Sequence, residues 1–235
     1  EIGVRLVGSE MCIRDRLRMG GDLPKQFIPM RGKPLLMHTL EAFHRWDASA
    51  RIILVLPEDH QPYWNMLCKE IGCKVPHAIV KGGDTRFFSV KNGLDWLLAE
   101  RRRKGEEDSG LSLVAVHDGV RPFVSPEVVE ACFDKAAVTG AVIPVVPMID
   151  SLRETDEKGS HPVDRSRYMA VQTPQVFLLE LLTKAYEQPY SSLFTDDASV
   201  VEAMGHAIDT VPGDRENIKI TTPFDLLIAE AMFAR

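Results

Sequence analysis

The sequence predicts an α/β fold in which a mostly parallel sheet carries helices on both of its faces. Short, continuous apolar runs recur along the chain, among them residues 52–56, 113–116 and 141–146, and each ends at proline or a polar residue. Such runs are typical of strands that are buried on both faces of a sheet. Amphipathic stretches separate them, and strands that alternate with helices favour right-handed, mostly parallel connections.

The first half of the chain supplies the N-terminal part of this sheet. Residues 2–7 are expected to form a strand at an edge, and an amphipathic helix is expected after Gly32-Lys33-Pro34, through about Phe43. The next expected elements are a strand at 51–56, a helix at 61–71, a strand at 74–80 and a helix at 87–101. Apolar residues of the last helix recur on one face at the 3.6-residue period.

The second half continues the alternation and adds a polar excursion. The expected elements are a strand at 113–116, a helix at 126–138, a strand at 141–146, two helices at 178–187 and 197–204, a short strand at 207–211 and a terminal helix from 222. Residues 147–161 are polar, which indicates a projecting arm. We therefore expect a single domain over residues 1–235, with residues 147–171 as its arm.

Composition excludes several classes of protein. The net charge of −6 argues against sequence-blind binding to nucleic acid, which needs a basic surface. No apolar run reaches the ~18 residues of a membrane span, and the first twenty residues lack the apolar region of a signal peptide. The four cysteines, which have neither CxxC spacing nor partnered histidines, are expected to be reduced thiols of a cytoplasmic protein: Cys12, Cys68, Cys73 and Cys132.

The central apolar run extends from Leu113 to Val116, and His117 and then Asp118 follow it. Open parallel sheets bind ligands beyond the carboxyl ends of their strands, where a carboxylate can hold a hard cation beside phosphates. Alternatively, Asp118 caps the helix that starts near Ser125 or bonds to its own turn. This stretch alone leaves both interpretations open.

Two loops carry glycine together with cations. Arg18 to Phe27 contains Gly-Gly, Pro and Lys25, and Lys81 to Arg86 contains Gly-Gly before a helix. Backbone amides freed by glycine, with cations nearby, suit a polyphosphate. The alternative for the first loop is a plain surface turn. The mixed-charge run 101–108 is interpreted as a solvated loop.

Seven short motifs occur in a characteristic order and at matching intervals. They are Arg18-Met19 with Pro24-Lys25-Gln26, Gly82-Gly83-Asp84 with Arg86 and Ser89-Val90, His117-Asp118 with Arg121-Pro122, Val163-Asp164-Arg165, Thr173-Pro174-Gln175, Thr195-Asp196, and Asn217-Ile218-Lys219. Together they resemble the 2-C-methyl-D-erythritol 4-phosphate cytidylyltransferases of the non-mevalonate isoprenoid pathway, from about Leu17 onward. The resemblance implies a Rossmann-like nucleotidyltransferase fold with a projecting β-arm.

The resemblance implies an activity and the residues of its nucleotide half. A phosphate oxygen of methylerythritol phosphate would attack the α-phosphorus of CTP, releasing pyrophosphate. The catalytic cations would be Arg18, Lys25 and Lys219, and Asp118 would hold Mg²⁺ or another divalent cation. Further nucleotide contacts would come from Gly82, Gly83, Asp84, Arg86, Ser89 and Asp118. For Arg86 the alternative is an arginine that packs at the start of its helix.

The resemblance also implies the acceptor half of the site and an assembly. The polyol phosphate would be held by Ser151, Arg165, Thr173 and Thr195. Arg165 and a hydroxyl on the arm would reach the neighbouring subunit's site in a homodimer. His117 is interpreted as a hydrogen-bonded residue at the strand end, because a phosphate nucleophile is already ionised and needs no base.

One departure from the family stands before Arg18. The family has an Ala-Ala-Gly-x-Gly-x-Arg-Met loop, whereas this chain has Cys12-Ile13-Arg14-Asp15-Arg16-Leu17. Arginine brings a Cβ and a long side chain where glycine lets the backbone approach the triphosphate. We therefore hypothesise that residues 1–16 are not native sequence.

Two alternatives for the function follow. A ribitol 5-phosphate cytidylyltransferase would share the nucleotide half, so only Ser151, Arg165, Thr173 and Thr195 discriminate. A catalytically impaired nucleotide-binding homologue is suggested by the missing glycine loop. Joint retention of the cations and the carboxylate favours an enzyme, because binding alone does not require all of them.

Overall fold

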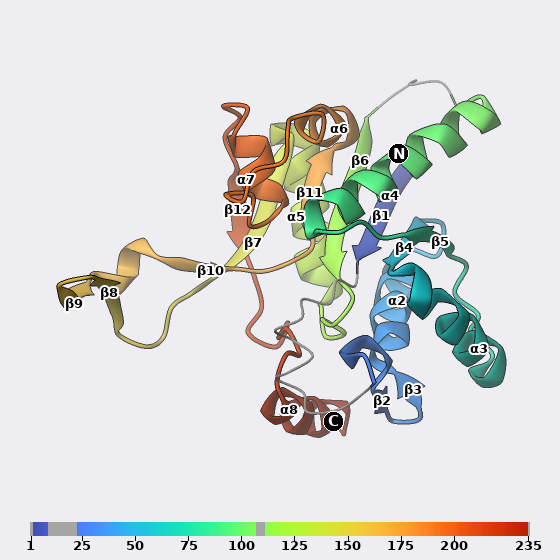
Figure 1. The fold of residues 1–235 in the computed structure, drawn as a ribbon, viewed down its shortest axis with the longest axis horizontal. Helices are drawn as coiled ribbons and strands as arrows, with labels where there is room; N and C mark the ends of the chain where they lie inside the picture. Colours follow the sequence, from blue (N-terminus) through green and yellow to red (C-terminus); the bar gives the residue numbers. More distant parts are fainter. Residues whose placement is uncertain (1, 9–22, 107–110, 235) are drawn as a thin grey trace.

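In the computed structural model, which describes residues 2–8, 23–106 and 111–234, an eight-stranded sheet lies between two layers of helices (Figure 1). Its order is β10-β7-β11-β6-β1-β4-β5, and β12 pairs with β7. The strands are β1 (Ile2–Gly8), β4 (Arg51–Leu56), β5 (Ala78–Lys81), β6 (Ser112–Asp118), β7 (Ala141–Pro147), β10 (Met169–Val171), β11 (Gln175–Leu178) and β12 (Asp209–Pro212).

Most pairings in this sheet are parallel. β1 is parallel to β4 and β6, β4 to β5, and β12 to β7, whereas β10 and β11 run antiparallel to their neighbours. The predicted mostly parallel α/β fold is confirmed. β1 lies between β4 and β6 rather than at an edge, so that expectation was wrong. Strand order follows from crossover connections, which local apolar patterns do not encode.

The helices divide between the two faces of the sheet. One face is covered by α2 (Leu35–Trp46), α3 (Gln61–Ile71) and α5 (Pro126–Thr139), and the other by α4 (Arg86–Lys104), α6 (Leu179–Ala185) and α7 (Asp197–Glu202). Each layer of helices forms a hydrophobic core with the face of the sheet that it covers. Ile52 and Leu54 of β4 point into one core, and Ile53 and Val55 point into the other. Burying one such side chain contributes about 1.5–3 kcal/mol, which explains why the strand is apolar throughout.

Local signals set the element boundaries. α4 begins after Thr85, whose side chain accepts from the Phe88 backbone N–H, and it ends at Gly105 with a φ of 65°. Glycine adopts that left-handed conformation without a steric penalty. β5 begins at Ala78 rather than at the predicted Lys74, since Pro76 cannot donate a ladder hydrogen bond.

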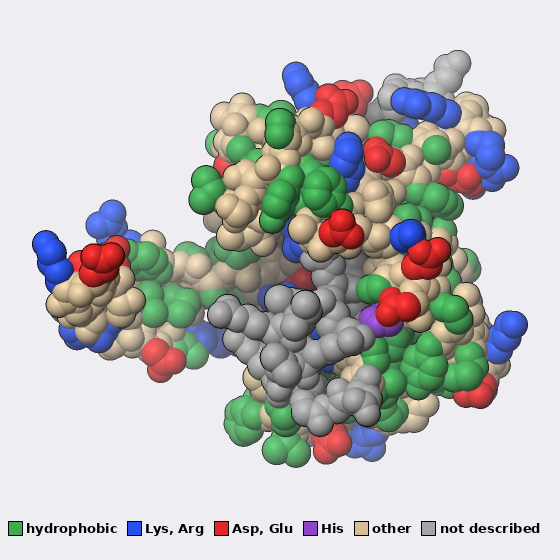
Figure 2. Space-filling model, viewed as in Figure 1, with side chains coloured by type: hydrophobic (Ala, Val, Ile, Leu, Met, Phe, Trp, Pro, Cys, Tyr) green, Lys and Arg blue, Asp and Glu red, His purple; other side chains and the backbone are tan. Residues whose placement is uncertain are grey.

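Smaller elements lie outside the sheet and its two helical layers. Some surround the carboxyl ends of the parallel strands, and a hairpin extends the molecule on one side. They are η1 (Lys25–Phe27), β2 (Pro29–Met30), β3 (Lys33–Pro34), η2 (Glu58–His60), the hairpin β8 (Leu152–Asp156) and β9 (Gly159–Val163), η3 (Arg165–Arg167) and α8 (Pro223–Phe233). The hairpin is paired only with itself among the described strands and stands clear of the body (Figure 2). No helix in the described part of the chain could cross a membrane.

Candidate active site

Asp118 ends β6 at the carboxyl edge of the sheet, between β1 and β11. Its Oδ2 lies 3.2 Å from Lys219 Nζ and accepts from Arg121 Nε at 3.0 Å. The helix that follows is capped by Ser125, whose hydroxyl accepts from the Val128 N–H. Asp118 is therefore not the helix cap, and its carboxylate belongs to a charged cluster.

The charge of Asp118 is maintained by its neighbours. Burial on its own would raise the pKa of this carboxyl, but Lys219, Arg121 and Arg86 outweigh burial and hold the pKa well below its usual range. The side chain remains 17% exposed, so a ligand can still reach it. The group is thus a carboxylate throughout the neutral range, as a cation ligand must be.

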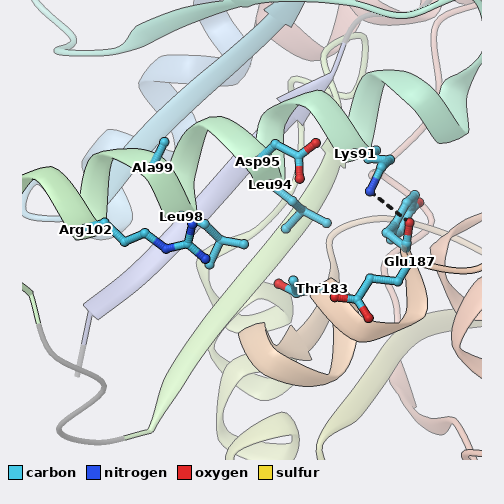
Figure 3. Close-up of a pocket in the computed structure, with 9 residues that line it drawn as sticks. Lys91, Leu94, Asp95, Leu98, Ala99, Arg102, Thr183 and Glu187 are labelled. Atoms are coloured by element: carbon cyan, nitrogen blue, oxygen red, sulfur yellow. Dashed lines mark hydrogen bonds between the residues drawn. The ribbon is translucent and has the colours of Figure 1, made fainter.

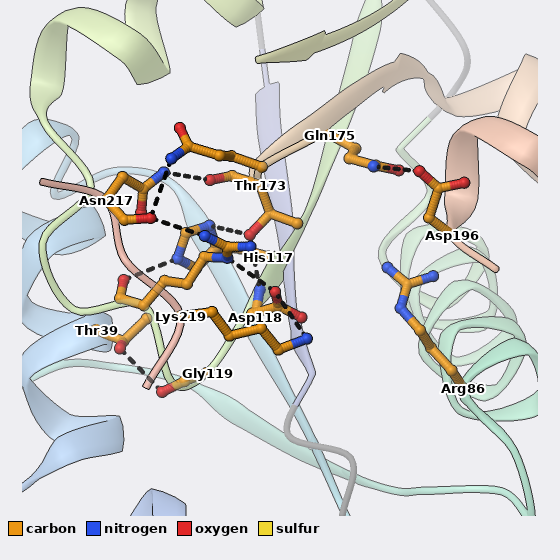
Figure 4. A network of polar contacts seen from close by, with 12 residues as sticks. Thr39, Arg86, His117, Asp118, Gly119, Thr173, Gln175, Asp196, Asn217 and Lys219 are labelled. Atoms are coloured by element: carbon orange, nitrogen blue, oxygen red, sulfur yellow. Dashed lines mark hydrogen bonds and ion pairs between the residues drawn. The ribbon is translucent and has the colours of Figure 1, made fainter. Parts of the chain in front are cut away.

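Thr173 joins β6 to the β10–β11 connection. Its Oγ1 accepts from the Asp118 backbone N–H at 3.1 Å and lies 3.1 Å from His117 Nδ1 (Figure 4). His117 Nε2 lies 3.0 Å from the Arg121 carbonyl. The tautomer that satisfies all three contacts carries its proton on Nε2, so that the Thr173 hydroxyl donates to Nδ1. Both ring nitrogens are therefore occupied, which agrees with the interpretation of His117 as a bonded strand-end residue.

Lys219 reaches Asp118 from a turn that follows β12. Asn217 Nδ2 donates to the Thr173 carbonyl at 2.8 Å, and Arg121 Nη1 donates to the Asn217 carbonyl at 2.7 Å. The Lys219 side chain is 42% exposed, whereas Arg121 is 11% exposed. The structure thus brings three predicted site residues into one contact network: Asp118, Thr173 and Lys219.

The predicted N-terminal cations fall partly outside the described residues. Arg18 lies there, together with the segment that replaces the glycine loop. Lys25 begins η1 and is buried, at 3% exposure. Next to it, Gln26 Nε2 lies 3.2 Å from His60 Nδ1, and Phe27 packs edge-on against Tyr63. These contacts fix η1 against η2 and the start of α3.

The second glycine loop is tightly packed at the start of α4. The Gly83 N–H donates to Ser89 Oγ at 3.0 Å, and the Gly82 N–H donates to the Leu56 carbonyl at 2.8 Å. A Cβ on Gly83 would lie 2.4 Å from the Phe88 Cβ, which is too close for any other residue. Ser89 is buried, whereas Asp84 is exposed. Glycine is therefore required here by close approach.

Arg86 is ion-paired inside the molecule. Its guanidinium donates to Asp197 Oδ2, and Tyr186 Oη donates to the other carboxylate oxygen at 2.6 Å. Asp197 is fully buried. Burial opposes the charge of Arg86, but Asp197 outweighs it and raises the pKa of the guanidinium. Arg86 therefore packs at the start of its helix, which was the alternative to a nucleotide contact. Its positive charge also acts on Asp118.

Comparisons with known proteins identify the family. The model of the family "IspD: 2-C-methyl-D-erythritol 4-phosphate cytidylyltransferase" matches residues 15–235. The chain belongs to this family. It is 55% identical over 216 residues to the 2-C-methyl-D-erythritol 4-phosphate cytidylyltransferase of Bacteroides fragilis, a match that covers 92% of this chain and 94% of that protein. The Porphyromonas gingivalis protein of that name is 50% identical over 218 residues, with 92% of each chain covered.

Solved structures agree with this cytidylyltransferase assignment. The 2-C-methyl-D-erythritol 4-phosphate cytidylyltransferase of Thermus thermophilus is 31% identical, with a TM-score of 0.74 and complete coverage of both chains. The 4-diphosphocytidyl-2C-methyl-D-erythritol synthase of Anaerococcus prevotii has a TM-score of 0.77 at 25% identity and covers 100% of this chain and 97% of that one. The Rossmann-like nucleotidyltransferase fold expected from the sequence is thus confirmed.

The acceptor residues predicted from the cytidylyltransferase family are spread over the molecule. Thr173 lies beside Asp118, but Ser151 and Arg165 are exposed on the arm, where the Arg165 guanidinium donates to the Ile149 carbonyl. Thr195 is exposed, one residue before the N-cap of α7. One described chain therefore does not bring its four predicted acceptor residues together.

Three residues that bond predicted site residues, or the turn that carries one, were not singled out from the sequence. Arg121 bonds Asp118, Asp197 pairs with Arg86, and Gln172 bonds the turn before Lys219. Arg121 stood inside a quoted motif, so its proximity to Asp118 could have been anticipated. The other two contacts join residues far apart in the sequence, and no spacing signals them.

A hollow of about 290 Å³ lies between α4 and α6, apart from this site (Figure 3). Its lining combines apolar and charged side chains, and none is a predicted site residue: Lys91, Leu94, Asp95, Leu98, Ala99, Arg102, Thr183, Tyr186 and Glu187. Lys91 is already engaged, since its Nζ donates to the Tyr186 carbonyl at 3.2 Å.

Proposed function

We propose that this chain transfers a cytidylyl group from CTP to 2-C-methyl-D-erythritol 4-phosphate, giving CDP-methylerythritol and pyrophosphate. The observation that carries the proposal is the contact of Lys219 Nζ with Asp118 at 3.2 Å, at the carboxyl edge of a central parallel strand. That edge is where open α/β sheets bind their ligands. Membership of the cytidylyltransferase family supports this activity over ribitol phosphate transfer.

The reaction needs charge stabilisation more than covalent help. A phosphate oxygen of the acceptor attacks the α-phosphorus in line, and the bond to the departing pyrophosphate breaks. Negative charge then spreads over the equatorial oxygens. Lys219 and Lys25, together with Arg18 from outside the described residues, supply the opposing positive charge.

Asp118 suits a divalent cation such as Mg²⁺. Magnesium keeps several waters and uses one or two carboxylates together with substrate phosphate oxygens. Asp118 would hold such an ion together with waters and phosphate oxygens of the nucleotide. An ion held by Asp118 would neutralise phosphate charge and help to orient the triphosphate.

The loop before α4 suits the cytosine ring. Gly82 and Gly83 let a base approach the backbone without side chains in the way, although their N–H groups are bonded to Leu56 and Ser89, and Asp84 stands exposed beside them. Ser89 already accepts from the Gly83 N–H, so its hydroxyl proton remains for the base edge. We assign the base to this loop, and the ion pair of Arg86 with Asp197 holds the start of the helix that follows the loop.

A homodimer would complete the acceptor site. Ser151 and Arg165 are exposed and flank the β8–β9 hairpin in the sequence, and this hairpin projects from the body (Figure 1). We propose that a partner subunit receives them, as the family resemblance implies.

The cysteines that the structure describes are free thiols, which supports a reducing compartment such as the cytoplasm.

The test is release of pyrophosphate from CTP by the purified chain, with methylerythritol 4-phosphate and ribitol 5-phosphate as parallel acceptors. We expect turnover with the first acceptor and its loss when EDTA removes the divalent cation. Preference for ribitol phosphate would move the protein to the sister activity. Saturable CTP binding without turnover would support the impaired homologue.

A further inference from the structure

The turn before Lys219 is held by the buried side chain of Gln172. Gln172 Nε2 donates to the Asp214 carbonyl at 2.7 Å and to the Asn217 carbonyl at 3.3 Å. Its Oε1 accepts from the Asp214 N–H at 3.1 Å. Gln172 is 6% exposed. One primary amide therefore engages three peptide groups of residues 214–217.

The backbone places Gln172 where it can make these bonds. The Gln172 N–H donates to the Pro144 carbonyl, and the Gly213 N–H donates to the Val145 carbonyl, each at 2.8 Å. The β10–β11 connection and the end of β12 are thus fastened to consecutive residues of β7. A Cβ on Gly213 would lie 2.5 Å from Gln172 Oε1, so glycine makes room for the amide.

The same turn is continuous with the reacting centre. Asn217 bonds Thr173 through its side chain and Arg121 through its carbonyl. Two residues later, Lys219 Nζ lies 3.2 Å from Asp118. The lysine side chain is long and 42% exposed, so the place of its ammonium depends on where the turn holds the backbone.

We propose that Gln172 is a positioning residue for cytidylyl transfer and that it acts through Lys219. Its amide fixes the 214–217 turn before substrate binds, so the ammonium is already directed at the phosphate when charge develops. The inference rests on the proposed function, since Lys219 is taken there as the cation of the reaction. The amide bonds turn backbone and needs no contact with substrate.

A double-mutant cycle on kcat tests the inference. Gln172→Leu keeps the size of the side chain but removes all three hydrogen bonds, and we expect kcat to fall on the order of 10- to 100-fold, with a smaller change in the KM for CTP. In the Lys219→Ala background the same substitution should cost little more, because its effect passes through the missing lysine.

Gln175→Leu is the matched control. Gln175 is also buried and lies three residues away. Its amide makes two bonds rather than three: it donates to Asp196 and accepts from the Ala198 N–H, and these bonds hold α7 instead of the turn. Any loss from Gln175→Leu should combine additively with Lys219→Ala. If Gln172→Leu does not fold, Gly213→Ala displaces the amide instead and should give the same non-additive pattern.

A second readout does not depend on turnover. After reductive ¹³C-methylation, the NMR signal of Lys219, assigned by its absence in Lys219→Ala, should shift in Gln172→Leu and stay unchanged in Gln175→Leu. Additive kcat effects or an unmoved signal would overturn the inference. An inactive wild type whose Lys219 signal still responds to Gln172→Leu would contradict the proposed function while leaving the placement of the lysine by Gln172 supported.

Discussion

At the scale of single residues, the site is a carboxylate surrounded by cations. Asp118 contacts Lys219 and Arg121 directly, and Arg86 acts on it through space. The excess of positive charge is what a triphosphate needs, since the polyanion brings negative charge that the cluster can neutralise. The resting ion pairs keep the lysine and the arginine in place until then.

The first prediction concerns Lys219. Lys219→Ala should lower kcat on the order of 10²–10³-fold, because one preorganised donor to the developing charge is lost. Steady-state pyrophosphate release measures the effect. Lys33→Ala is a matched control: Lys33 is 40% exposed and pairs with Glu41 outside the network, so kcat should stay unchanged. Equal losses in both variants would contradict the role of Lys219.

The second prediction concerns Asp118 and pH. Its folded-state pKa is depressed, so the ionised form contributes stability that is fully present above the unfolded pKa of about 3.9 and is lost as the pH falls through the lower folded value. Asp118→Asn should therefore be less stable than the wild type at pH 7, and the difference should shrink only below about pH 4. Urea unfolding from pH 7 to pH 3 measures it. A constant difference over that range would disprove the coupling.

At the scale of elements, one buried ion pair joins α4 to α7. Arg86 begins α4, Asp197 begins α7, and Tyr186 directly follows α6. The Arg86–Asp197–Tyr186 group thus lies where three helices meet on one face of the sheet. This contact also fixes the loop for which we propose base binding, because Gly83 and Ser89 flank Arg86 along the chain.

The third prediction is that breaking this pair destabilises the fold. Asp197→Ala leaves Arg86 without its partner and should lower the free energy of unfolding by about 3 kcal/mol. Tyr186→Phe, which loses one hydrogen bond to a charged group, should cost about 1.5–3 kcal/mol. Denaturant unfolding measures both. Glu58→Ala removes an exposed partner of Lys81 and should leave stability nearly unchanged. Equal effects in all three variants would refute the account.

At the scale of the whole molecule, the proposed dimer gives the arm a part in the partner's acceptor site. If Arg165 serves the partner's site, Arg165→Ala and Lys219→Ala fall in the same site of a mixed dimer and leave its other site intact. The fourth prediction is that the two inactive variants, co-refolded in equal amounts, recover about a quarter of wild-type activity, because half of the dimers then hold one intact site. Activity no higher than the sum of the separate variants would contradict the shared site.

The sequence predicted the helical layers and singled out Asp118, Thr173 and Lys219, which the structure brings into one contact network, but it did not predict how strands and turns meet. Apolar runs in the sequence indicate buried strands, and Asp118 was singled out because it lies at the end of such a run. The interior position of β1, the pair of Arg86 with Asp197 and the bond of Gln172 to the Lys219 turn depend on long-range packing. Such contacts leave no period or spacing in a single sequence.

The most direct test of the central claim is the fate of the α-phosphate. CTP labelled at that phosphate is mixed with the purified chain, Mg²⁺ and methylerythritol 4-phosphate, and the products are separated. The account predicts that the label moves into a CDP-alcohol while pyrophosphate leaves unlabelled. Label that stays in CTP with every acceptor offered, or that enters only a ribitol product, would contradict it.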